Sequence, residues 1–112
     1  MKEYFIWKGV LEMEQFLYQL KLKPYYLVNE NWTEKEEGII NRHFQQLKKF
    51  TEEGKVILAG RTLNEDESGF GIVIFEEESE LSAKEFMEND PAIREGMMEG
   101  TLFPYRVALM RK

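Results

Sequence analysis

The clearest pattern of polar and apolar positions lies in the first half of the chain. Thr33, followed three residues later by Glu36, forms a capping box, in which both side chains accept hydrogen bonds from backbone amides at a helix start. The pattern predicts a helix that runs to about Glu53, because Gly54 can take the left-handed conformation that ends a helix. The β-branched apolar run Val56–Gly60 follows directly and predicts a strand.

Two further strands are predicted in the second half of the chain. The polar turn Asn64–Gly69 precedes Phe70–Phe75, the most apolar strand of the sequence. Because the connection is short, we expect this strand to pair with Val56–Gly60 as a hairpin. The segment Thr101–Met110 is interpreted as the last strand, and Pro104 within it predicts a sheet edge or a bulge.

A second helix is predicted between these strands. Either Ser79 or Ser82 can cap its start. We expect the helix to end near Asn89, because Pro91 disfavours helical geometry at Asp90.

The first third of the chain fits two periodicities. The alternation over residues 16–23 is typical of a half-buried strand, whereas a helical stripe is formed by Val10, Met13, Phe16, Leu17 and Leu20. We favour the strand, since it gives the order β-α-β-β-α-β of a ferredoxin-like α+β domain, an antiparallel sheet with two helices on one face. This domain would span residues 14–112, and residues 1–13 would be an N-terminal extension with a possible extra strand through Tyr4–Trp7.

The composition of the strands predicts a partner for the sheet. An antiparallel sheet with one face in water should alternate polar and apolar residues, but Val56–Ala59 and Ile72–Phe75 do not alternate. Two helices cover only one face. We therefore expect the second face to pack on the same face of a second copy in a two-fold homodimer, in preference to cover by the N-terminal extension.

Composition and charge exclude several classes of protein. A chain of 112 residues supports one domain, and 15 Lys plus Arg against 21 Asp plus Glu give a net charge of −6, which argues against nucleic-acid binding. Without cysteine there is no disulfide, thiol nucleophile or zinc-thiolate site. No apolar run exceeds four residues, whereas a membrane-spanning helix needs about 20. We expect a cytoplasmic protein without nucleic-acid or membrane partners.

His43 is the only histidine of the chain. At about 100° per residue it falls inside the apolar stripe of the first predicted helix, which is formed by Ile40, Phe44, Leu47 and Phe50. A buried imidazole needs a hydrogen-bond partner, and desolvation disfavours its charged form. The spacing leaves two interpretations open: a neutral histidine bonded within the core, or a catalytic or ligand-binding histidine.

Asp90 is the second candidate. Directly before Pro91, it is well placed to cap a short helix or turn. Antiparallel packing of the two predicted helices would also bring Asp90 beside the first half or middle of the first helix, where His43 lies. A carboxylate next to a histidine orients the imidazole and raises its basicity, so the functional hypothesis is a proton-transfer pair.

Other signatures of catalysis are absent from the sequence. There is no GxSxG, GxxxxGK[ST] or HExxH motif, and Gly69–Gly71 lacks the third glycine of a dinucleotide-binding motif. The acidic residues of the segment 76–80 are better explained as solvated side chains at a helix N-terminus than as a metal site. We therefore predict no metal.

Five segments of the chain carry a resemblance to a known family: Asn31–Glu36, Arg42–Phe44, Glu53–Gly60, Gly69–Val73 and Asn89–Ala92. In this order they resemble the YCII-related (YciI-like) family, over about residues 16–110. The resemblance implies a ferredoxin-like α+β fold that dimerises through its sheets, akin to muconolactone isomerase. It also implies an active site of one His and one Asp, which map onto His43 and Asp90.

The resemblance implies lyase or isomerase chemistry on a small molecule. In our first hypothesis His43, oriented by Asp90, is the general base for an organic acid or enol, and no cofactor is needed. The alternatives are a non-catalytic dimeric module that binds a ligand or regulates, and an interaction domain with a structural histidine. Arg61 stands where the family often has proline; it would bind an anionic substrate or be a surface cation opposite Glu65 or Asp66.

Overall fold

The computed structural model describes residues 13–112, and the predicted order of the main elements is confirmed. The strands and long helices are β1 (Glu14–Leu22), α2 (Glu34–Glu52), β2 (Val56–Arg61), β3 (Gly71–Glu77), α3 (Glu80–Glu88) and β4 (Met98–Pro104). The short helical turns are η2 (Pro24–Leu27), η3 (Asn29–Asn31) and α4 (Pro91–Arg94). The possible strand Tyr4–Trp7 lies outside the described residues, as does almost all of the predicted extension.

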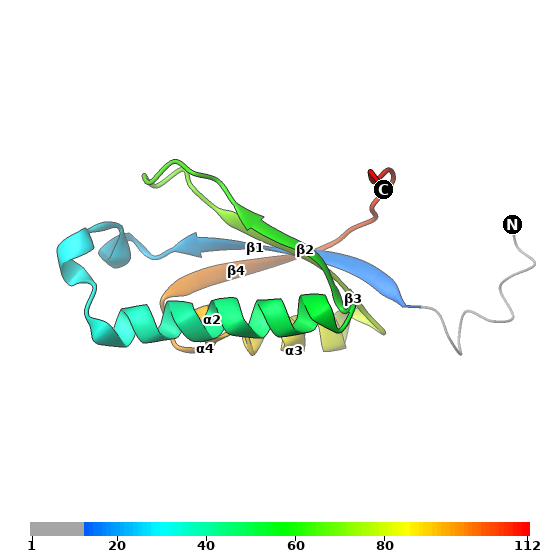
Figure 1. Ribbon diagram of the computed structural model, residues 1–112, viewed down its shortest axis with the longest axis horizontal. Coiled ribbons are helices and arrows are strands. Elements are labelled where there is room, and N and C mark those ends of the chain that lie inside the picture. The colour runs from blue at the N-terminus through cyan, green and yellow to red at the C-terminus, as the bar shows by residue number, and fades with distance from the viewer. Residues whose placement is uncertain (1–12) are drawn as a thin grey trace, which may run out of the picture.

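The four strands form one antiparallel sheet in the order β2-β3-β1-β4. All three helices, α2, α3 and α4, lie on the same face of this sheet (Figure 1). The arrangement confirms the α+β class and is compatible with the ferredoxin-like fold. Of the two interpretations of the first third of the chain, the strand is correct, because β1 is a central strand between β3 and β4.

Local sequence signals set the ends of the two long helices. Thr33 caps α2, and the Glu36 carboxylate accepts a hydrogen bond from the Thr33 amide at 2.9 Å, which completes the predicted capping box. Gly54 follows the helix with φ of +90°, a conformation that side chains other than glycine rarely adopt. Of the two serines considered for α3, Ser79 is the N-cap, and Ser82 is its partner in a second capping box.

The last strand differs from the prediction. The bounds Thr101–Met110 are wrong, because β4 covers Met98–Pro104 and the chain beyond it is not a strand. After Pro104, the Tyr105 amide donates one more hydrogen bond to Gln15 O at 3.1 Å. Since β1 itself begins at Glu14, little backbone remains there for pairing. Pro104 lies on an edge strand, as predicted.

An aromatic core fills the space between the sheet and the helices. Phe16 and Tyr18 of β1, Phe75 of β3 and Phe86 of α3 pack tilted or edge-on, with ring centroids 4.6–6.3 Å apart. A second, smaller cluster around Ile39 joins α2 to the segment that contains α4. These two clusters pack the helices against the sheet and set their distance from the central strand β1.

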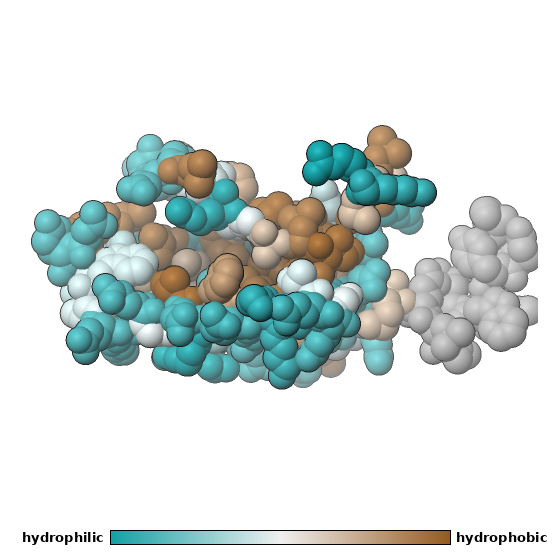
Figure 2. Space-filling view, in the orientation of Figure 1, coloured by the Kyte–Doolittle hydropathy of each residue, from teal (hydrophilic) through white to brown (hydrophobic). Residues whose placement is uncertain are grey.

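The other face of the sheet carries an apolar row that α2, α3 and α4 leave uncovered (Figure 1). In register across the four strands it consists of Leu58, Ile74, Leu17 and Phe103. Leu58 and Phe103 are 42% and 44% exposed, whereas Ile74 between its neighbours is only 4% exposed. Figure 2 shows apolar side chains gathered over the sheet, above the polar outer surface of α2. Both faces of β3 are thus apolar, and we call this row the open-face row.

Candidate functional site

Helix α2 turns His43 toward the sheet. Ile39 is 1% exposed and Phe44 is 60% exposed, so the buried face of the helix is centred near His43. The predicted placement of His43 within the buried face is confirmed, but Phe44 does not belong to that face. The His43 side chain itself is 15% exposed. It therefore lies at the border between the core and the surface.

Asp90 lies at the junction between α3 and α4. Its backbone is extended, Pro91 takes the first helical position, and Oδ1 accepts a hydrogen bond from the Ala92 amide at 2.9 Å. Asp90 is therefore the predicted N-cap of a short helix. The residue is only 1% exposed. Because burial of a carboxylate is costly unless hydrogen bonds compensate for the lost water, we expect further partners around it.

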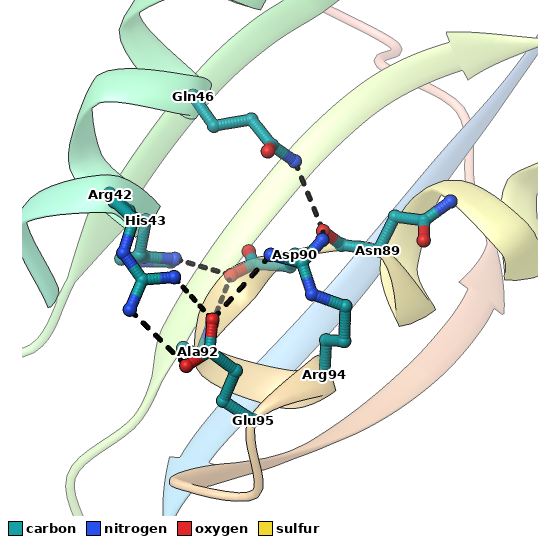
Figure 3. Close-up of polar contacts among 8 residues, drawn as sticks. All are labelled: Arg42, His43, Gln46, Asn89, Asp90, Ala92, Arg94 and Glu95. Atoms are coloured by element: carbon teal, nitrogen blue, oxygen red, sulfur yellow. Dashed lines mark hydrogen bonds and ion pairs between the residues drawn. The ribbon is translucent and has the colours of Figure 1, made fainter. Parts of the chain in front are cut away.

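Two side chains from distant parts of the chain supply these partners. His43 Nδ1 lies 2.7 Å from Asp90 Oδ1 (Figure 3). The hydroxyl of Tyr18 donates to the other carboxylate oxygen, Asp90 Oδ2, at 2.6 Å. The structure thus brings together the two residues predicted for the site and adds Tyr18 of β1, which sequence reasoning missed. The available signal was a tyrosine on the buried face of a strand, which needs a partner for its hydroxyl, but the sequence does not name that partner.

The donors around Asp90 determine where the protons lie. Burial, then the charge of Asp90 and the hydrogen bond to it, raise the pKa of Tyr18 well above its usual range, so the phenol keeps its proton. The Ala92 amide can only donate. With Asp90 Oδ1 as the acceptor, His43 Nδ1 is the donor in the contact between the two side chains. In the neutral form of the ring, Nε2 then has a free lone pair, which a general base needs.

Nε2 of His43 is also the ring atom through which a small molecule could react. Within residues 13–112 no hydrogen bond involves Nε2, and no side-chain nitrogen or oxygen in that part of the chain is buried without a partner. The exposed 15% of the side chain is consistent with access to the ring. The arrangement can therefore accept a proton from a small molecule at Nε2 while Asp90 stabilises the imidazolium that forms.

Charged side chains tie helix α2 to the α3–α4 junction beside this pair (Figure 3). Arg42 donates to both carboxylate oxygens of Glu95, and Arg94 Nη2 lies 3.6 Å from Glu95 Oε2. The hydrogen bond from Arg42 is the main cause that lowers the pKa of Glu95. Gln46 and Arg94 both donate to the carbonyl of Asn89, at 3.3 and 3.2 Å. These contacts hold His43 against Asp90 without bonding to either.

Arg61 lies at the end of the edge strand β2. It is exposed, and among the described residues its guanidinium makes one long hydrogen bond, 3.5 Å, to the Thr62 carbonyl. Within the described residues it forms no ion pair with Glu65 or Asp66 and no hydrogen bond with the His43 pair. A role for Arg61 in substrate binding stays a prediction.

A cavity of about 340 Å³ lies on the face of the sheet away from the helices. Its lining residues are Gln15, Ile57, Glu76, Val107, Ala108 and Met110. None of them belongs to the His43 pair. In the described part of the chain no group of three His, Cys, Asp or Glu side chains is arranged to hold a metal ion. The helices between residues 13 and 112 are too short or too polar to cross a membrane.

Comparison with protein families gives one assignment. The model of the YCII-related domain matches residues 16–104, from within β1 to the end of β4. The matched segment contains Tyr18, His43 and Asp90. A comparison with curated proteins finds no match.

Proposed function

The chain belongs to the YCII-related family, and from this premise we propose that it is a small-molecule enzyme of lyase or isomerase type. In this proposal His43 is the general base and Asp90 orients it. The supporting observation is the 2.7 Å contact between His43 Nδ1 and a carboxylate that is 1% exposed.

The proposed chemistry follows from the protonation of the pair. Nε2 removes a proton from a carbon or from an enol hydroxyl of the substrate, and the electron pair of the broken bond stays on the substrate as an enolate. Asp90 stabilises the imidazolium through the hydrogen bond at Nδ1. Return of the proton to a different atom completes an isomerisation, and loss of a leaving group from the neighbouring carbon completes an elimination. Neither route requires a cofactor.

Turnover of a substrate panel tests this proposal. We would assay lactones, enols and chlorinated aromatic compounds with the wild type, His43→Gln and Lys48→Gln. Lys48 pairs with Glu52 on the exposed side of the same helix, so it is a matched control. We expect His43→Gln to lose about 10²–10⁴-fold in rate and Lys48→Gln to keep full activity. Undiminished turnover by His43→Gln contradicts the proposal, and binding without turnover favours the non-catalytic ligand-binding module.

We also propose that the protein is a two-fold homodimer in which the open-face row packs on its copy. The row runs unbroken across all four strands, and its outer members, Leu58 and Phe103, are 42% and 44% exposed. A two-fold axis places the same patch of both subunits in contact, which suits a self-complementary apolar row. Such a contact would remove these side chains from water.

The mass of the full chain in solution tests the dimer. We expect sedimentation or light scattering to give twice the chain mass of 13.4 kDa for the wild type. Phe103→Glu places a charge in the row and should give a monomer. Leu81→Glu is the control, since Leu81 is 69% exposed on α3, away from the row. A monomeric wild type, or a Phe103→Glu variant that remains a dimer, contradicts the proposal.

A further inference from the structure

Tyr18 is the third side chain at the His43–Asp90 pair, and it comes from the middle of the sheet. We propose that Tyr18 is a positioning residue, a permanent hydrogen-bond donor that holds the Asp90 carboxylate directed at His43 and thereby sets the basicity of the ring. The consequence for catalysis rests on the proposed function. The effect of Tyr18 on Asp90 and His43 does not depend on that function, and it can be tested without a substrate.

The packing around Tyr18 allows its hydroxyl group only one position. The residue is 1% exposed, and its ring packs edge-on against Phe75 and Phe86, with centroids 5.6 and 6.3 Å apart. Its backbone is paired on both sides, with Val73 and with Leu102. The side chain therefore cannot swing away, and the 2.6 Å hydrogen bond to Asp90 Oδ2 is fixed by the packing of the sheet.

The two oxygens of Asp90 have different partners. Oδ2 accepts from Tyr18, whereas Oδ1 accepts from the Ala92 amide and from His43. A hydrogen bond to a charged acceptor stabilises the charged form. Without the phenol, the negative charge of Asp90 would be balanced mainly through Oδ1, and the His43–Asp90 pair would hold its added proton more tightly.

The other charged groups at this junction do not bond to the three side chains. Arg42, Arg94 and Glu95 bond to one another and to the backbone, and Glu36 on the same face of α2 bonds to Thr33. No hydrogen bond joins Tyr18 directly to His43 within residues 13–112. An effect of Tyr18 on the histidine ring must therefore pass through Asp90.

An NMR titration of His43 tests the proposal. Because His43 is the only histidine, its ring signals are identified without further variants. We would compare the wild type with Tyr18→Phe, which removes the donor, and with 3-fluorotyrosine at position 18, which strengthens it. Matched controls carry the same two replacements at Tyr105, which is 44% exposed and outside the site.

The two replacements at position 18 should act in opposite directions. We expect Tyr18→Phe to move the midpoint of the His43 titration up by about one pH unit and 3-fluorotyrosine to move it down, with no change for the Tyr105 controls. An unchanged midpoint in both position-18 variants overturns the proposal, even if both lose stability, because a purely structural tyrosine would behave in that way.

The outcomes remain separable from those of the enzyme assay. If Tyr18→Phe does not fold, the fluorinated variant keeps the ring and hydroxyl and still decides the question. Opposite midpoint shifts together with an active His43→Gln variant would uphold the role of Tyr18 and contradict the proposed enzyme. Unshifted midpoints together with an inactive His43→Gln variant would contradict the role of Tyr18 and support the proposed enzyme.

Discussion

Two acidic side chains are buried in the described part of the chain, Glu36 and Asp90, and both serve the N-terminus of a helix. The partners of Glu36 are the amide and hydroxyl of Thr33, three residues away. Asp90 accepts from the nearby Ala92 amide, but also contacts His43 and Tyr18, which are 47 and 72 residues away. The Glu36 carboxylate thus bonds within its own helix start, whereas Asp90 connects the α3–α4 junction to α2 and β1.

The difference separates a carboxylate that only caps a helix from one that also contacts a histidine. Hydrogen bonds from Thr33 lower the pKa of Glu36, and no titratable side chain is bonded to its carboxylate within the described residues. The carboxylate of Asp90 instead lies between two titratable side chains, His43 and Tyr18. A capping carboxylate that also holds a histidine can therefore influence proton transfer, and one that holds only its own helix start cannot.

The largest effect should come from removing the shared carboxylate. Asp90→Ala leaves the Tyr18 hydroxyl, the His43 ring and the Ala92 amide without their acceptor, and we expect a loss of about 3–5 kcal/mol in the free energy of unfolding. Glu36→Ala should lose less, since its partners lie near water. Urea denaturation of both variants measures the difference. Equal losses would contradict the distinction between the two carboxylates.

The second prediction concerns alkaline stability. Because the pKa of Tyr18 is raised in the folded protein above its ordinary value of 10.0, its contribution to stability is fully present below that pH and is lost as the pH rises further. We expect this loss to be about 1.4 kcal/mol per pH unit, and Tyr18→Phe to remove it. Urea denaturation at about pH 9, 10 and 11 tests this. In Tyr105→Phe the free energy of unfolding should fall with pH as steeply as in the wild type. If Tyr18→Phe also falls that steeply, the buried Tyr18 phenol is not the cause of the alkaline loss.

A smaller effect is expected at the local cap. Thr33→Ala removes the hydroxyl that caps α2, and we expect a loss of about 1 kcal/mol in the free energy of unfolding. Thr33→Ser keeps a hydroxyl and should retain most of that stability. The His43 titration should be unchanged in both variants. A shifted His43 midpoint in Thr33→Ala would show that the two carboxylates are coupled after all.

The smallest effect should appear at acid pH. The folded pKa of Glu36 lies below its ordinary value of 4.5, so its stabilising contribution is present above that pH and is lost as the pH falls through the folded value. Glu36→Gln should therefore flatten the decline of stability with falling pH. Glu34→Gln removes the same charge from the same helical turn and is the control. If the stability of both variants falls equally with decreasing pH, the hydrogen bonds of the capping box do not cause the loss of stability in acid.

The predictable parts of the fold depend on signals between near neighbours. The start of α2 follows from Thr33 and Glu36, its end from Gly54, and the place of His43 on the buried face from the helical period. The end of β4 was predicted wrongly, because the strand can continue only as far as β1 offers backbone to pair with. That limit depends on strand register, which the sequence of β4 alone does not contain.

The sequence by itself determined the order of the elements and the cap of α2, and it named His43 and Asp90 as candidate site residues. Only the tertiary structure placed the Asp90 carboxylate within 2.7 Å of His43 and added Tyr18 to the pair. The physical reason is the range of the interactions. Caps and turns form between residues two to four apart, whereas the three side chains of the site meet only because the aromatic core and the Ile39 cluster set how the helices pack on β1.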